Sequence, residues 1–158
     1  MEDVLEEFVR TVEEASARML SMTEAESRVP LADEKWSAKE TLGHLIDSAS
    51  NNHQRLVRAQ FKEDLVFQGY EQDAWVRVQA YQDEPWPLLV NLWKFYNLHL
   101  AHVCRRAPES ERLRARREHN LHEIGWVPVA AEEPATLEYM MRDYVAHLKN
   151  HLRQIFGG

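Results

Sequence analysis

Residues 36–48 read WSAKETLGHLIDS, and this stretch decides the fold that the sequence predicts. Ser37 and Glu40 have the spacing of a capping box. In this motif the serine side chain accepts a hydrogen bond from the Glu40 N–H, and the glutamate side chain accepts one from the serine N–H. Beyond the box, apolar residues recur at helical spacing, at Leu42, Leu45, Ala49, Leu56 and Ala59. A helix is therefore expected from Ser37 to about Phe61.

Three other segments of the chain carry long apolar stripes of helical period. They predict helices from about Asp3 to Met22, from the Pro85 region to Pro108, and from about Thr136 to just before Gly157. A short extra helix is expected around residues 72–82. Strand patterns are nearly absent, because the one alternating stretch, Trp126 to Val129, contains a proline that cannot donate a ladder hydrogen bond. The sequence predicts one all-α domain, a four-helix bundle over residues 1–158.

Composition excludes several classes of function. The 158 residues carry a formal net charge of −7, which provides no basic field for nonspecific nucleic-acid binding. The basic run from Arg112 to Arg117 is interpreted as a solvated surface. The only cysteine, Cys104, is expected to be a buried inert thiol. An acidic N-terminus and the lack of a long apolar run predict a cytoplasmic protein without a membrane span.

The chain contains eight histidines, and two of them have a spacing that suits a metal ion. His147 and His151 are four residues apart, so their Cβ atoms lie roughly 6 Å apart on one helix face. That face also carries Met140, Tyr144 and Ile155, and two imidazoles against an apolar interior need polar partners. One divalent cation would satisfy both rings, with a third ligand from elsewhere.

Periodicity alone leaves the third ligand open. His44 lies away from the apolar stripe of its helix, on a polar ridge with Asp47, Ser48, Asn51 and Arg55. Periodicity favours solvated surface for this ridge. The alternative is a cleft in which Asp47, Asn51 and Arg55 lie near a bound anion or a metal ligand. Among the other histidines, His99 is interpreted as a core residue, His53 and His102 as structural, and His119 and His122 as solvated.

Several motifs resemble the DinB/YfiT-like superfamily. Residues 36–48 are similar to its GHLxD-type second helix, and residues 140–151 resemble its last helix with an HxxxH motif. The middle of the chain is similar to it at residues 51–53, 70–75 and 97–100. The resemblance implies a four-helix bundle of non-sequential topology, a homodimer, and a divalent metal, zinc or nickel, held by His44, His147 and His151.

The resemblance also implies chemistries for such a site. The leading one is a thiol S-transferase that activates a low-molecular-weight thiol, as in relatives that use bacillithiol or mycothiol. A metal-dependent hydrolase is the alternative, with Asp47 as the nearby general acid or base. A noncatalytic metal-binding stress-response module is the third. Asn51 and Arg55 are the candidates for substrate recognition, and neither nucleic acid nor a membrane is an expected partner.

Overall fold

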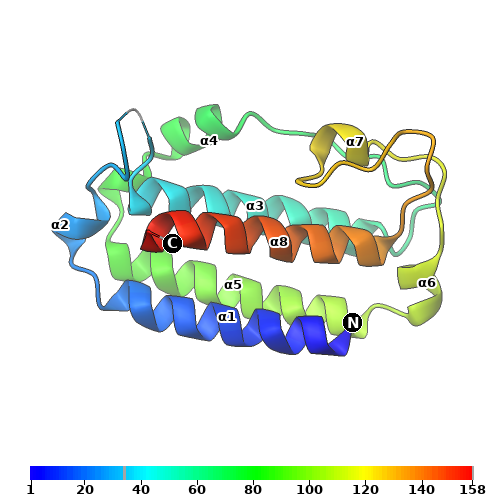
Figure 1. The fold of residues 1–158 in the computed structure, drawn as a ribbon, viewed down its shortest axis with the longest axis horizontal. Helices are drawn as coiled ribbons and strands as arrows, with labels where there is room; N and C mark the ends of the chain where they lie inside the picture. Colours follow the sequence, from blue (N-terminus) through cyan, green and yellow to red (C-terminus); the bar gives the residue numbers. More distant parts are fainter. Residues whose placement is uncertain (34, 158) are drawn as a thin grey trace.

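The computed structural model describes residues 1–33 and 35–157 and contains four long helices (Figure 1). These are α1 (Glu2–Leu20), α3 (Ala38–Arg58), α5 (Trp86–Arg106) and α8 (Leu137–Phe156). Shorter helices lie between them: α2 (Glu24–Ser27), α4 (Gln72–Gln79), the 3-10 helix η1 (Tyr81–Asp83), α6 (Glu109–Leu113) and α7 (Leu121–Ile124). Within the described residues β pairing is limited to isolated bridges, so the all-α prediction is confirmed.

Local chemistry fixes where the two site-bearing helices begin. The Ser37 side chain accepts a hydrogen bond from the Glu40 N–H at 3.2 Å, and the Glu40 carboxylate accepts one from the Ser37 N–H at 2.9 Å. This is the capping box that the sequence predicts. Thr136 caps α8 by accepting from the Tyr139 N–H at 3.1 Å, and α8 stops at Gly157, whose φ of 72° is left-handed.

The order of the helices around the bundle differs from their order along the chain. Both α1 and α3 pack against α5 and α8, so the consecutive long helices α1 and α3 lie on opposite corners. Helix α5 is antiparallel to α1, since Trp86 donates to the Met19 carbonyl and Arg105 pairs with Glu2. The expectation of a non-sequential four-helix bundle is therefore confirmed.

The bundle core is apolar and continuous across the four long helices. Its largest fully buried side chains are Leu5, Phe8, Met19, Leu42, Leu45, Leu56, Trp86, Trp93, Leu100 and Leu137. Cys104 is buried as expected, and burial raises the pKa of its thiol to about 12, which keeps it in the unreactive protonated form. Among the described residues, no helix has the length and apolar character to cross a membrane.

A second layer covers the outer side of α3 and α8 (Figure 1). It consists of the connection from 59 to 85, with α4 and η1, and the connection from 107 to 136, with α7. The two connections are tied together because the Asn120 side chain donates to the Phe67 carbonyl and accepts from the Phe67 N–H. The N-terminal half of α3 is buried nearly all round and α3 contacts α4 and η1, so this half of the helix lies between the bundle and the cover.

The basic run in the second connection is not uniformly solvated as expected. Arg116 is 3% exposed, and its guanidinium donates to the Ala59 carbonyl at 2.9 Å and to the Glu111 carboxylate at 3.0 Å. The interpretation as open surface was wrong at this residue because Glu111 supplies a charge partner that composition does not reveal.

Candidate metal centre

Three histidines from α3 and α8 converge on one point under the cover. The Nε2 atom of His147 lies 3.3 Å from that of His44 and 3.1 Å from that of His151. One nitrogen from each ring falls within 4.8 Å of the other two. Antiparallel packing of α3 on α8 produces this arrangement, because it sets the first half of α3 against the second half of α8.

The three nitrogens fit a divalent metal ion. Ligands about 2.0–2.1 Å from zinc at tetrahedral positions lie about 3.3 Å apart, close to the two shortest separations here. Hydrogen bonding alone explains the cluster less well, because a neutral imidazole nitrogen carries either one hydrogen or one lone pair. The His147 Nε2 atom faces two such nitrogens. One cation would accept a lone pair from each of the three rings.

Burial keeps these imidazoles in the neutral form that binds metals. It lowers the pKa of His44 to about 4, with a further contribution from nearby His151. It lowers the pKa of His147 to about 3, again with repulsion from the other two rings, and it lowers the pKa of His151 although His151 donates a hydrogen bond to the Gln154 amide oxygen. All three shifts follow from desolvation of the charged form.

Two side chains lie against the outer ring nitrogens. The Nδ1 atom of His151 is 2.9 Å from the Gln154 amide oxygen, and the Nδ1 atom of His147 is 3.5 Å from the Ser48 hydroxyl. An acceptor at Nδ1 holds the proton there and turns the Nε2 lone pair toward a shared ligand. His44 Nδ1 is buried without a partner among the described residues.

His44 is only 2% exposed, although its helical periodicity points away from the bundle core. The expectation of solvated surface was wrong because the second layer packs on that face of α3. The Trp36 ring lies 5.2 Å from the His44 ring, and Tyr70 lies 6.5 Å from it on the connection between α3 and α4. The alternative interpretation, a polar ridge that lines a cleft, describes the observed arrangement.

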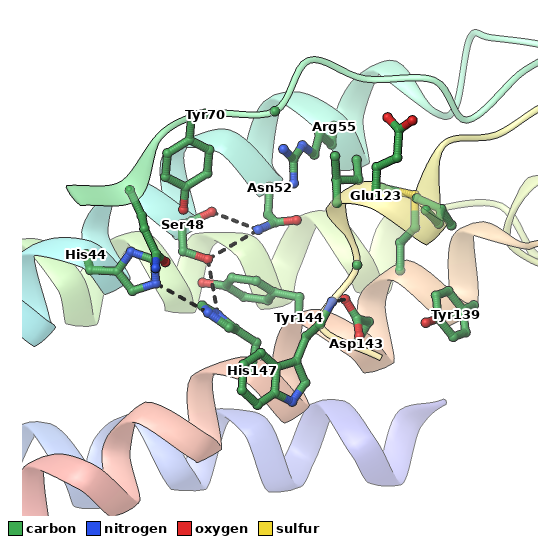
Figure 2. A pocket seen from close by; sticks show the side chains of 17 residues that line it. His44, Ser48, Asn52, Arg55, Tyr70, Glu123, Tyr139, Asp143, Tyr144 and His147 are labelled. Atoms are coloured by element: carbon green, nitrogen blue, oxygen red, sulfur yellow. Dashed lines mark hydrogen bonds between the residues drawn. The ribbon is translucent and has the colours of Figure 1, made fainter. Parts of the chain in front are cut away.

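A cavity of about 260 Å³ opens beside His44 and His147. Figure 2 shows that α3 and α8 form its walls, with the segment before α4 and the segment around α7 above them. Its other polar and aromatic lining residues are Ser48, Asn52, Arg55, Tyr70, Gln72, Glu123, Trp126, Tyr139, Asp143 and Tyr144.

The other three predicted site residues occupy different surroundings. Asp47 is 2% exposed, and its Oδ1 atom accepts from Tyr81 at 2.7 Å and Gln79 at 2.5 Å, which directs the carboxylate toward α4 and η1. The Asn51 side chain donates to the Asp47 carbonyl and does not line the cavity. Arg55 lines the cavity wall. The proposed roles of these three residues remain predictions.

The remaining histidines agree with the predictions only in part: His122 is exposed as expected, but His99 and His119 are not where they were predicted. His99 is exposed rather than in the core, because it lies on the outer face of α5, and His102 is exposed on the same face. His53 is half-buried against the Tyr96 hydroxyl, 3.3 Å away. His119 is buried rather than solvated, because its ring nitrogens lie 2.7 Å from the Glu133 carbonyl and 3.2 Å from the Leu121 N–H.

Sequence reasoning did not identify the residues that shape the cavity roof. Trp126 lies over the site, with its ring 5.5 Å from His147, in a stretch that the sequence suggests is only a loop. Asp143 anchors that stretch by accepting from the N–H groups of Trp126 and Val127 at 2.9 and 2.7 Å. One signal was present: Asp143, His147 and His151 are spaced by four residues and share one face of α8.

Comparison with known proteins identifies the fold and the family of this chain. A sequence model of the DinB superfamily matches residues 7–155. The solved structure of YfiT from Bacillus subtilis superposes with a TM-score of 0.75 over 97% of this chain and 84% of that chain, at 19% identity. YfiT is described there as a probable metal-dependent hydrolase with an unusual four-helix bundle topology. No curated protein sequence matches this chain. Since the family match extends over nearly the whole sequence, this chain belongs to the DinB superfamily.

Proposed function

We propose that this protein is a metal-dependent enzyme whose divalent ion, zinc or nickel, is held by His44, His147 and His151. The observation that carries the proposal is the convergence of three neutral imidazole nitrogens at one end of a cavity. A divalent ion in this site would lower the pKa of a thiol or a water molecule that it binds.

Transfer of a low-molecular-weight thiol to an electrophile is the reaction that the site favours. Among the carboxylates near the imidazoles, Asp143 holds two backbone N–H groups and Asp47 faces Tyr81, which leaves exposed Glu123 on α7 as the other carboxylate that lines the cavity. A thiol ionises far more readily than water, so a thiol nucleophile depends less than a water nucleophile on a side-chain base to remove its proton. Its sulfur forms a bond to an electrophilic carbon, the leaving group departs with the electron pair of the broken bond, and the thiol proton passes to solvent.

Hydrolysis is the second candidate, supported by the description of YfiT. It places an extra demand on the site, because a leaving group must receive a proton. Asp47 is the residue proposed for that role. Burial raises the pKa of its carboxyl group, which favours a proton-carrying form, and its Oδ2 atom has no partner among the described residues.

Metal analysis of protein made without an affinity tag tests the proposal first, because a nickel column can load the site. We expect about one divalent ion per chain. Cobalt-substituted protein should then change its visible spectrum when thiols are added, and His147→Ala should abolish the change. His99→Ala is the matched control, since His99 is exposed on the outer face of α5 and lies outside the cavity.

The possible outcomes separate the candidate functions. A thiol-dependent spectrum with turnover of electrophiles supports S-transfer. An unchanged spectrum with turnover of esters or amides supports the hydrolase. Metal binding with neither activity supports a noncatalytic module, and absence of metal from both the untagged and the reconstituted protein contradicts the proposal.

We also propose that the protein forms a homodimer through the outer face of α5. Leu88, Leu92 and Phe95 are 54%, 47% and 63% exposed there, and their alternating spacing of four and three places them on one stripe. A row of large apolar side chains in water favours association with a second copy. Sedimentation should show a dimer that Phe95→Glu dissociates, and a monomeric wild-type protein would refute this proposal.

A further inference from the structure

Within the described part of the chain, Arg55 is a buried cation without a carboxylate partner. Its side chain is on the C-terminal half of α3, and the residue is 8% exposed. The guanidinium donates one hydrogen bond, from Nη2 to the Gln68 carbonyl at 2.9 Å. Among the residues that the structure describes, no carboxylate lies within ion-pair distance of it. Burial lowers its pKa, and the nearby Tyr70 phenol, rather than a carboxylate, opposes the shift.

The other two buried lysine and arginine side chains differ in this respect. The Lys39 ammonium contacts the Glu24 carboxylate and donates to the Gln82 carbonyl. Arg116 pairs with the Glu111 carboxylate. A buried charge costs several kcal/mol unless a counter-charge and hydrogen bonds compensate it, as they do at Lys39 and Arg116. At Arg55 no such counter-charge offsets the cost of burial, so a bound anion would stabilise the charged side chain.

Arg55 also lies in the cavity that contains the histidine site (Figure 2). It follows His44 by about three helical turns on the same face of α3, a separation of about 16 Å along the axis. Ser48 and Asn52 lie between them and line the same wall. The cavity thus has imidazole nitrogens at one end and a guanidinium toward the other.

We propose that the physiological ligand carries a carboxylate that pairs with Arg55 while its other end reaches the three histidines. This inference rests on the proposed function, in which that other end is a thiol. A guanidinium fork matches the two oxygens of a carboxylate. A phosphate dianion suits the site less well, because Glu123 and Asp143 line the same cavity and would repel the second charge. The ligand class is therefore an elongated thiol with a remote carboxylate.

The test compares matched probes on cobalt-substituted full-length protein. Mercaptopropionate, mercaptohexanoate and mercaptoundecanoate are titrated beside the mercaptoalcohols of equal length, and binding is followed by the visible spectrum. We expect the longer carboxylates to bind about 10-fold or more tightly than their alcohols, the range for a charge-assisted hydrogen bond, and mercaptopropionate to show no advantage. Arg55→Gln should remove the advantage, so that a carboxylate and the alcohol of equal length bind with equal affinity.

Arg58→Gln is the control, since Arg58 is exposed one turn further along α3 and lies outside the cavity. Equal affinities for carboxylates and alcohols of every length in wild-type protein overturn the inference, whether or not Arg55→Gln folds.

If no thiol changes the spectrum, the thiol proposal fails, and the carboxylate is tested separately on metal-free protein. Hexanoate and hexanol are then compared by calorimetry. Binding of hexanoate alone, lost in Arg55→Gln and kept in Arg58→Gln, supports the carboxylate site, and no preference overturns it.

Discussion

Two groups of histidines lie on opposite sides of α3, and only one group converges. In the inner group, His44, His147 and His151, nitrogens from three rings fall within 4.8 Å of one another. In the outer group, the ring centres of His53 and His99 are 5.3 Å apart and those of His99 and His102 are 6.3 Å apart. The described residues contain no second cluster of three potential ligands. The inner ring centres lie 4.6–5.3 Å apart, so the inner rings are on the whole closer together than the outer ones, and only their nitrogens converge.

Burial is the physical difference between the two groups. The inner group lies between antiparallel α3 and α8 and beneath the second layer, where desolvation lowers the pKa of each ring. Within the single chain, the outer group lies on the uncovered side of α3 and α5, where His99 and His102 are exposed. The imidazoles of the inner group are therefore held neutral and oriented toward a shared cation, whereas the exposed imidazoles of the outer group can rotate toward solvent.

Removal of one inner ligand should give the largest effect. We expect His147→Ala to lower the affinity for zinc by more than about 100-fold, because loss of an orienting partner alone costs about 10–100-fold. Competition against a chromogenic chelator measures the change. His99→Ala should leave the affinity unchanged, and equal losses in the two variants would show that the inner and outer groups do not differ in function.

The cover over the inner group should be sensitive to a single methyl group. A Cβ atom at Gly43 would lie 2.1–2.6 Å from ring atoms of Tyr81, whose hydroxyl holds Asp47. We expect Gly43→Ala to lower the free energy of unfolding by about 1–3 kcal/mol, since overpacking outweighs the gain of about 1 kcal/mol in helix propensity.

Urea denaturation measures this loss, and Gly69→Ala provides a matched control. A Cβ atom at Gly69 would meet its nearest neighbour at an ordinary 3.7 Å, so little change is expected. Equal stability of Gly43→Ala and wild type would mean that Tyr81 can move away and that the cover is not tightly fitted to α3.

The sequence predicts the elements well because their signals are local. The Ser37–Glu40 box and the apolar stripe place α3 at Ala38–Arg58, close to the expected 37–61, and the four-residue spacing identifies His147 and His151. Burial of His44 and exposure of His99 could not be predicted in this way. A helical wheel describes one helix against one core, and it contains no information about a second layer formed by non-periodic connections.

The lowered histidine pKa values predict a pH-dependent stability of the metal-free protein. His44 and His147 have pKa values of about 4 and 3 in the folded chain, below the ordinary 6.5. The unfolded chain therefore binds more protons as the pH falls below 6.5, and the free energy of unfolding decreases through that window. Carboxyl groups titrate mainly below about pH 5, so the decrease between about pH 7 and pH 5 should come largely from histidines.

Chemical denaturation at several pH values tests this sign. The double variant His44→Gln, His147→Gln should lose less stability than wild type between neutral and mildly acidic pH. Parallel pH profiles for the two proteins would show that other groups, such as half-buried His53, dominate the dependence.

The smallest effect is expected from the residue that orients His151. The Gln154 amide oxygen lies 2.9 Å from His151 Nδ1, where it accepts the ring hydrogen and leaves the Nε2 lone pair free to face His147. Gln154 is exposed, so water can replace it in part, and Gln154→Leu should weaken zinc binding by about 10-fold at most. Gln154→Glu should strengthen it, because a carboxylate makes the ring more basic. If neither variant changes the affinity measured by chelator competition, packing between α3 and α8 alone orients the inner histidine rings. The difference between the inner and outer histidines would then depend only on burial.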